Sequence, residues 1–131
     1  MKVSTVWKND HAFEGWQDEN SINIDGDRVQ GVSPKSLLLS GLAGCSGIDV
    51  VDILEKMRVP FSDFSIDVES EQTEEHPKVF KDIHITYKIK TAPENEDKVR
   101  KAVELSLEKY CGVSAMLKKN SAIHFTIVII K

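Results

Sequence analysis

Hydrophobic and polar residues alternate along several short stretches of the chain. Phe64–Val68 and Ile83–Ile89 alternate cleanly, and Ile22 and Ile24 alternate with polar neighbours. An alternation of period two is typical of half-buried strands. It predicts that Phe64–Val68 and Ile83–Ile89 form a hairpin. Shorter extended segments and a closing β-branched strand are expected at residues 2–8, 12–17, 21–25 and 122–130.

A long helical stretch follows Ser33 and Pro34, which suit an N-cap and a first helical position, and it should end near Arg58, before Pro60. Its first half is apolar or small on every side, so we expect it to be buried all round. Glycines at positions 41, 44 and 47 each cost about 1 kcal/mol relative to alanine in a helix. Their spacing predicts that another helix approaches closely on that side.

A capping-box pattern at Thr91–Glu94 predicts the start of a second helix, which is expected to run from about residue 91 to Lys109. Cys111-Gly112 breaks it, and a short third helix is expected over Val113–Lys119. The order of strands, helix, hairpin, helix and strand favours an α+β fold with an antiparallel sheet and two main helices. The chain, residues 1–131, is expected to form a single domain.

Charge and hydropathy exclude several classes of function. Seventeen Lys and Arg against twenty-one Asp and Glu give a net charge of −4, and the basic residues are scattered, so a nucleic-acid partner is not expected. The longest uncharged run, Ser36–Ile48, is shorter than the roughly 20 residues of a membrane span, so no membrane partner is expected either. The first residues lack a signal-peptide pattern, so a cytoplasmic location is expected.

The two cysteines, Cys45 and Cys111, are the candidate reactive groups. Metal binding is not expected, because the cysteines and the four histidines lack ligand spacing. Asp25-Gly26-Asp27 resembles the start of a calcium loop, but the remaining ligand positions are missing, so it is interpreted as a turn. Cys45 lies too far along its helix to benefit from the helix dipole, and it could be inert core filler. Cys111 precedes the third helix, whose free N–H groups can stabilise a thiolate, although a plain turn cysteine is equally possible.

The stretch Ser33–Arg58, with Gly44-Cys45-Ser46 and Asp49-Val50-Val51, resembles the cysteine-bearing helix of the OsmC/Ohr superfamily of osmotically inducible and organic-hydroperoxide-resistance proteins. Tyr110–Leu117 resembles the second motif of that superfamily. The resemblance implies an intertwined homodimer with the two cysteine-bearing helices at its centre. It implies that Cys45 is peroxidatic and Cys111 resolving, with an organic hydroperoxide as substrate, a small or lipoyl-type dithiol as reductant, and no bound cofactor.

Two departures from the superfamily pattern bear on this function in oxidative-stress defence. Lys35 and Ser36 stand where the well-characterised members have a glutamate, and Ala12–Gln17 lacks their arginine. Arg28, in a nearby predicted loop, is the candidate substitute for stabilising the thiolate, and Lys35 is a second source of positive charge. The alternative is a stress-associated or small-ligand-binding protein that keeps the fold but does not turn over peroxide.

Overall fold

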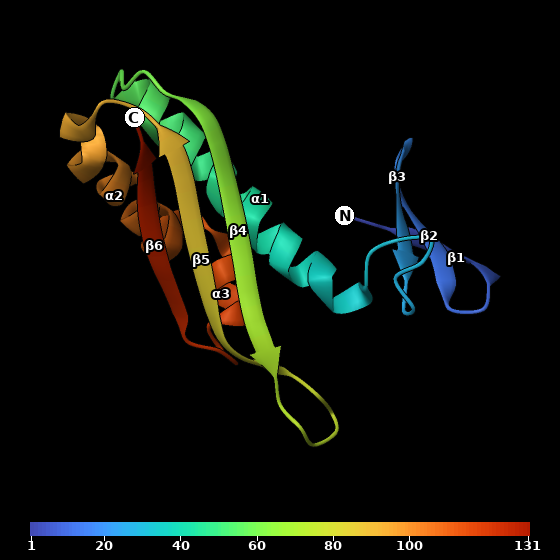
Figure 1. The fold of residues 1–131 in the computed structure, drawn as a ribbon. Helices are drawn as coiled ribbons and strands as arrows, with labels where there is room; N and C mark the ends of the chain where they lie inside the picture. The colour runs from blue at the N-terminus through green and yellow to red at the C-terminus, as the bar shows by residue number, and fades with distance from the viewer. The chain divides into compact units, whose positions relative to one another are not determined.

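The computed structural model describes all 131 residues, and their contacts divide the chain into two compact units. The first unit comprises Met1–Leu39 and the second Ser40–Lys131. Each unit has its own three-stranded sheet (Figure 1). The units are described separately below, and the expectation of a single domain over residues 1–131 stays a prediction.

The N-terminal unit is an antiparallel meander of three strands. The strands are β1 (Ser4–Asn9), β2 (Ala12–Gln17) and β3 (Asn20–Asp25), in the order β1-β2-β3. Both hairpins have two-residue connections that begin with a residue at positive φ, Asp10 and Asp18. Aspartate tolerates this conformation better than most residues, and the tight turns fix the register of the strands. The three N-terminal strands expected from the sequence are confirmed.

The loop after β3 is organised by the carboxylate of Asp25, which is 3% exposed. It accepts hydrogen bonds from the backbone N–H groups of Asp27 at 2.8 Å, Gln30 at 2.9 Å and Val29 at 3.3 Å. These donors hold the pKa of the Asp25 carboxyl below its usual range, and the N–H of Gln30 has the largest effect. The carboxylate therefore closes a turn, as the sequence analysis expected.

The C-terminal unit contains one sheet with helices on one face (Figure 1). Helix α1 (Pro34–Lys56) begins in the first unit and continues into the second. The strands are β4 (Ser62–Gln72), β5 (Phe80–Lys90) and β6 (Ile123–Ile130). Between β5 and β6 the chain forms a 3₁₀ turn, η1 (Pro93–Asn95), helix α2 (Glu96–Leu105), a π-helical segment, η2 (Ser106–Tyr110), and helix α3 (Gly112–Leu117).

The α+β class is confirmed, but the expectation of one antiparallel sheet is wrong. There are two sheets, and although β4 and β5 form the expected antiparallel hairpin, β6 lies parallel to β5, from Ile83↔Ile123 to Lys90↔Ile130. The physical reason lies in the connection. Parallel neighbours need a crossover of a dozen or more residues, usually helical, and segment 91–122 supplies it.

The helical crossover begins differently from the predicted capping box. The Thr91 hydroxyl donates to the carbonyl of Pro60 at 2.7 Å and accepts from the Asn95 amide at 3.1 Å, and no side chain caps α2. Thr91 thus ties the end of β5 to the segment that follows α1. The predicted second and third helices themselves are confirmed, with bounds close to those expected.

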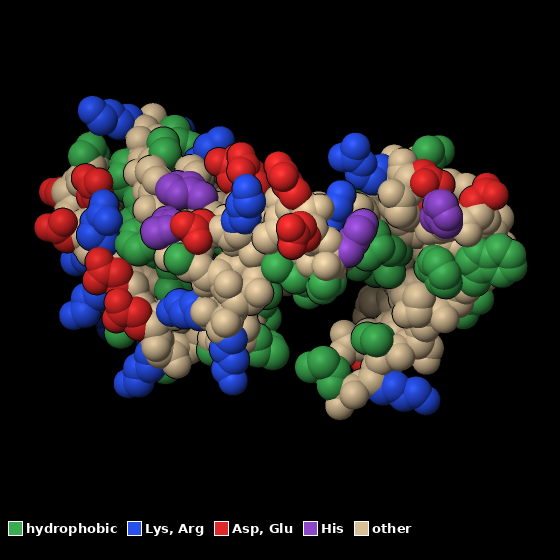
Figure 2. Space-filling model, turned by 90° about the horizontal axis from the view of Figure 1, so that it is seen from below, with side chains coloured by type: hydrophobic (Ala, Val, Ile, Leu, Met, Phe, Trp, Pro, Cys, Tyr) green, Lys and Arg blue, Asp and Glu red, His purple; other side chains and the backbone are tan.

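The core of the C-terminal unit lies between the inner face of the sheet and the helices. Its fully buried side chains come from alternate positions of β5 and from the apolar faces of α1 and α2. They include Ile83, Ile85, Tyr87 and Ile89 of the strand, Leu42, Val50 and Leu54 of α1, and Val99 and Val103 of α2. The outer surface mixes both signs of charge: Figure 2 shows Lys and Arg interspersed with Asp and Glu over this unit.

The expectation that the first half of α1 is buried all round is wrong for the single chain. A Cβ added at Gly41 or Gly44 would meet no atom within 4 Å, and Ile48 is 65% exposed. Only Gly47 has a close neighbour, since its added Cβ would lie 3.0 Å from Ile66 Cδ1. By length and composition α1 would also suffice to cross a bilayer, a property that core helices of soluble proteins share. We name the exposed strip formed by Gly41, Gly44 and Ile48 the α1 open face.

Candidate active site

The structure brings the two cysteines together within the C-terminal unit. Cys45 lies on α1 and is half-buried, whereas Cys111 lies between η2 and α3 and is 3% exposed. The two side chains are near enough for Cys45 to raise the pKa of Cys111. Two thiols in contact can be joined by a two-electron oxidation to a disulfide. The cysteine pair is therefore the candidate redox centre.

Cys111 occupies the N-cap of α3, as the sequence analysis expected for a residue before the third helix. Its Sγ accepts the backbone N–H of Ser114 at 3.3 Å, and the Ser114 hydroxyl donates to the Cys111 carbonyl at 3.0 Å. Burial nevertheless raises the pKa of Cys111, the Ser114 N–H lowers it, and the neighbouring Cys45 raises it again; the net direction is upward. Cys111 therefore remains a protonated thiol near neutral pH.

A buried group of hydroxyls includes that of Ser46, the residue after Cys45. The Ser46 and Tyr87 hydroxyls are 2.7 Å apart. Ser106 Oγ lies 2.9 Å from Ser46 Oγ and 3.0 Å from a carboxylate oxygen of Asp49. Ser46, Tyr87 and Ser106 are fully buried, and no buried side-chain polar atom lacks a partner. We call Ser46, Tyr87 and Ser106, together with the Asp49 carboxylate that accepts from Ser106, the hydroxyl cluster. It joins α1, β5 and η2.

Tyr87 keeps its proton throughout the physiological range. Burial raises its pKa to about 12, opposed by the hydrogen bond to Ser46 and assisted by the nearby Cys111 and Asp49. The hydroxyl cluster was not predicted from the sequence. The available signal was Tyr87 itself, a polar-tipped side chain on the inward-facing positions of an otherwise aliphatic strand, whose hydroxyl requires a buried partner.

Arg28, the third predicted site residue, belongs to the N-terminal unit, whereas both cysteines belong to the C-terminal unit. It has a positive φ of 58°, and its backbone N–H donates to the carbonyl of Asp25 at 3.1 Å. The loop that carries it is therefore held by Asp25 through both backbone and side chain. Its pairing with a cysteine stays a prediction.

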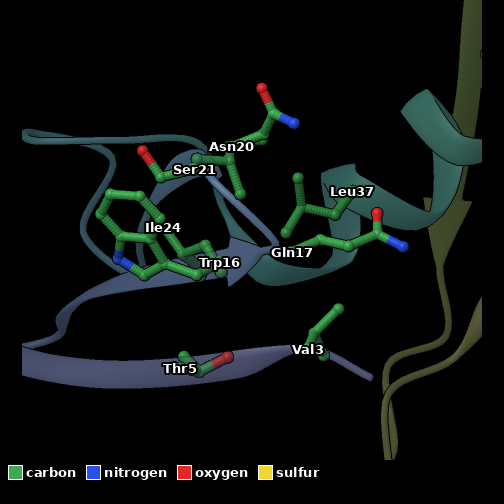
Figure 3. Close-up of a pocket in the computed structure, with 10 residues that line it drawn as sticks. Val3, Thr5, Trp16, Gln17, Asn20, Ser21, Ile24 and Leu37 are labelled. Atoms are coloured by element: carbon green, nitrogen blue, oxygen red, sulfur yellow. The ribbon is translucent and has the colours of Figure 1, made fainter. Parts of the chain in front are cut away.

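The N-terminal unit has a largely apolar pocket of about 350 Å³ (Figure 3). Trp16, Ile24 and Leu37 contribute apolar side chains, and Gln17 and Asn20 stand at the pocket with polar ones. No group of three or more His, Cys, Asp or Glu is placed to hold a metal ion. The chain thus contains a thiol pair in one unit and an apolar pocket in the other.

The exposure of the two thiols and the raised pKa of Cys111 predict their order of alkylation. With limiting iodoacetamide at pH 7, Cys45 should react first, because it is half-exposed while Cys111 is buried and protonated. Between pH 7 and pH 9 the reaction at Cys111 should accelerate by about tenfold per pH unit, because the thiolate is the reacting form and the pKa is raised. Peptide mass spectrometry measures both rates. Faster alkylation of Cys111, or a rate at Cys111 that is flat with pH, would contradict this ordering.

Comparison with known proteins identifies the family. Residues 25–126 match the family model described as OsmC-like protein. The chain is 40% identical to Protein YhfA of Escherichia coli K12, over 91% of this chain and 90% of that protein.

Solved structures of other proteins share this fold. A hypothetical protein from Aquifex aeolicus VF5 is 30% identical, with a TM-score of 0.84 over 99% of this chain and 97% of its own. The organic hydroperoxide resistance protein OhrB of Bacillus subtilis shares the fold at 19% identity, with a TM-score of 0.64 over 96% of each chain. The model match, which covers most of the chain, and the identity to YhfA together show that the chain belongs to the OsmC-like protein family.

Proposed function

We propose that the protein reduces organic hydroperoxides by means of its cysteine pair, in defence against oxidative stress. The observation that carries the proposal is that Cys45 and Cys111 lie in the same compact unit, near enough for Cys45 to raise the pKa of the Cys111 thiol. The fold that it shares with OhrB, an organic hydroperoxide resistance protein, agrees with it. A reducing compartment such as the cytoplasm, where we place the protein, would keep both cysteines as thiols between turnovers.

The proposed reaction has three balanced steps. The Cys45 thiolate attacks the terminal peroxide oxygen, the O–O bond breaks, and an alcohol leaves, so that Cys45 becomes a sulfenic acid. The Cys111 sulfur then attacks the Cys45 sulfur, and water leaves as the disulfide forms. A small or lipoyl-type dithiol finally transfers two electrons to the disulfide and is itself oxidised. No bound cofactor takes part in this scheme.

Exposure supports the assignment of roles to the two cysteines. Cys45 is the more accessible thiol and would meet a peroxide first, whereas Cys111 is nearly enclosed and lies near Cys45. The exposed apolar side chains of Tyr110 and Met116 flank Cys111 along the chain, at 55% and 65% exposure. They would favour a peroxide with an apolar organic group over hydrogen peroxide.

The proposal also assigns a role to Arg28 and to a second subunit. Arg28 would supply the positive charge that stabilises the Cys45 thiolate, in place of the arginine missing from β2. A homodimer would cover the α1 open face, where Gly41 and Gly44 leave room for another helix backbone. The active protein would then be a dimer with a cysteine pair in each subunit.

A turnover assay tests the proposed function. With cumene hydroperoxide and dihydrolipoamide, the protein should produce cumyl alcohol catalytically, and Arg28→Ala should slow the reaction about tenfold or more through loss of a charge near the thiolate. Lys101→Ala, which removes a surface charge from α2, serves as the control and should leave the rate unchanged. Alcohol is quantified by chromatography. A wild-type rate no higher than that of buffer would contradict the proposal.

The apolar pocket of the N-terminal unit supports a second candidate function, the binding of a small apolar ligand without turnover. Pockets of this size with mostly apolar walls suit small organic ligands. Trp16 lies at the pocket, so a bound ligand should change tryptophan fluorescence (Figure 3). Saturable quenching by a non-oxidising ligand, together with no peroxide turnover, would favour this function.

A further inference from the structure

Ser106 connects both cysteine-bearing segments by separate hydrogen bonds. Its side-chain oxygen lies 2.9 Å from Ser46 Oγ, and Ser46 is the residue after Cys45. Its backbone carbonyl accepts the N–H of Cys111 at 2.7 Å. One fully buried residue therefore contacts the immediate neighbour of one cysteine and the backbone of the other.

The π-helical segment explains how one residue reaches both partners. Cys111 N–H bonds to the carbonyl five residues earlier, the spacing that defines a π turn. Such turns are uncommon and are frequently found at functional sites. Here the wider turn ends the helix at Tyr110 and leaves Cys111 with an extended backbone, in the N-cap position of α3.

Asp49 strengthens the attachment to α1. Its carboxylate oxygen lies 3.0 Å from Ser106 Oγ, one helical turn beyond Cys45. A hydrogen bond to an ionised acceptor is stronger than one between neutral groups. Ser106 is therefore hydrogen-bonded to α1 at two residues about one helical turn apart, Ser46 and Asp49.

We propose that Ser106 is a positioning residue, which sets the approach of the Cys45 and Cys111 sulfurs and thereby favours their disulfide. This inference rests on the proposed function, because it concerns the resolving step of that reaction. Disulfides tolerate only a narrow range of separations between their Cα atoms, so a small displacement of η2 along α1 disfavours bond formation. Ser106 itself takes no part in the electron transfer.

The test is the equilibrium of the cysteine pair with reduced and oxidised dithiothreitol, read by thiol trapping and mass spectrometry. Ser106→Ala should lower the equilibrium constant for the Cys45–Cys111 disulfide about tenfold. Asp49→Ala, which removes only one of the attachments, should lower it about threefold. Asp49→Asn, which keeps an acceptor oxygen, should stay close to wild type.

Ser121→Ala is the matched control, because Ser121 is a buried serine near the end of the crossover whose hydroxyl donates to the Phe80 carbonyl at 3.1 Å and has no hydrogen bond to η2. It should change the equilibrium constant less than twofold. An unchanged constant in Ser106→Ala, or an equal loss in Ser121→Ala, would overturn the positioning role. A wild-type pair that dithiothreitol cannot oxidise would overturn it together with the proposed function. A pair that dithiothreitol oxidises but hydroperoxide does not would overturn the proposed function alone.

Discussion

Cys45→Ser should abolish hydroperoxide reduction, to the rate of buffer alone. A serine hydroxyl is not ionised at neutral pH and cannot form a sulfenic acid, so the first step of the proposed reaction is lost. The protein should still fold, because the exchange of sulfur for oxygen at a half-buried helical position removes no packed side chain. Alcohol production from cumene hydroperoxide measures the loss, and circular dichroism confirms the fold.

Cys111→Ser is the matched variant for this prediction. It should reduce one equivalent of hydroperoxide and then stop, with a sulfenic acid on Cys45 that reacts with dimedone. The wild-type protein should show little dimedone adduct, because Cys111 lies near Cys45 and would resolve its sulfenic acid. An adduct on Cys111 with Cys45 still reduced would reverse the two roles.

Ile48→Glu should convert a homodimer into a monomer. Ile48 lies on the α1 open face at 65% exposure, beside two glycines that lack any neighbour in the single chain. A carboxylate buried between two helices without a partner would cost on the order of 3 kcal/mol, so dimer affinity should fall by about 100-fold or more. Multi-angle light scattering at micromolar concentration should give twice the 14.7 kDa chain mass for wild type and 14.7 kDa for the variant.

Val128→Glu controls for the effect of a new surface charge. Val128 is a 40% exposed apolar residue of β6, away from α1 along the chain, and its replacement should leave the dimer intact. A wild-type mass of 14.7 kDa would contradict the dimer and would leave Gly41 and Gly44 without the close neighbour that offsets their cost.

The periodic patterns predicted the elements well and their pairing less well. The alternation in β4 and β5 and the small apolar residues of α1 locate these elements within a few residues. The partner of β6 could not be predicted from its own residues, because a strand rich in Val and Ile fits either orientation. The length of the helical crossover before it, residues 91–122, was the better guide to a parallel arrangement.

The site was predictable in its reactive groups but not in their surroundings. Cys45 and Cys111 stood out as the two thiols of the chain, but their proximity could be known only from the tertiary structure. The hydrogen bonds that join Ser46, Ser106 and Asp49 could not be predicted from the sequence, because serine and aspartate are common on exposed helix faces. Their role depends on the π turn at Ser106–Tyr110, which an ordinary helical pattern does not predict.

The most direct test of the central claim is the mass of the fully reduced protein after reaction with one equivalent of cumene hydroperoxide. The proposed reaction predicts a chain lighter by two hydrogen atoms, with Cys45 and Cys111 linked in the peptide map and one equivalent of cumyl alcohol released. An unchanged mass with both thiols still reduced would contradict it.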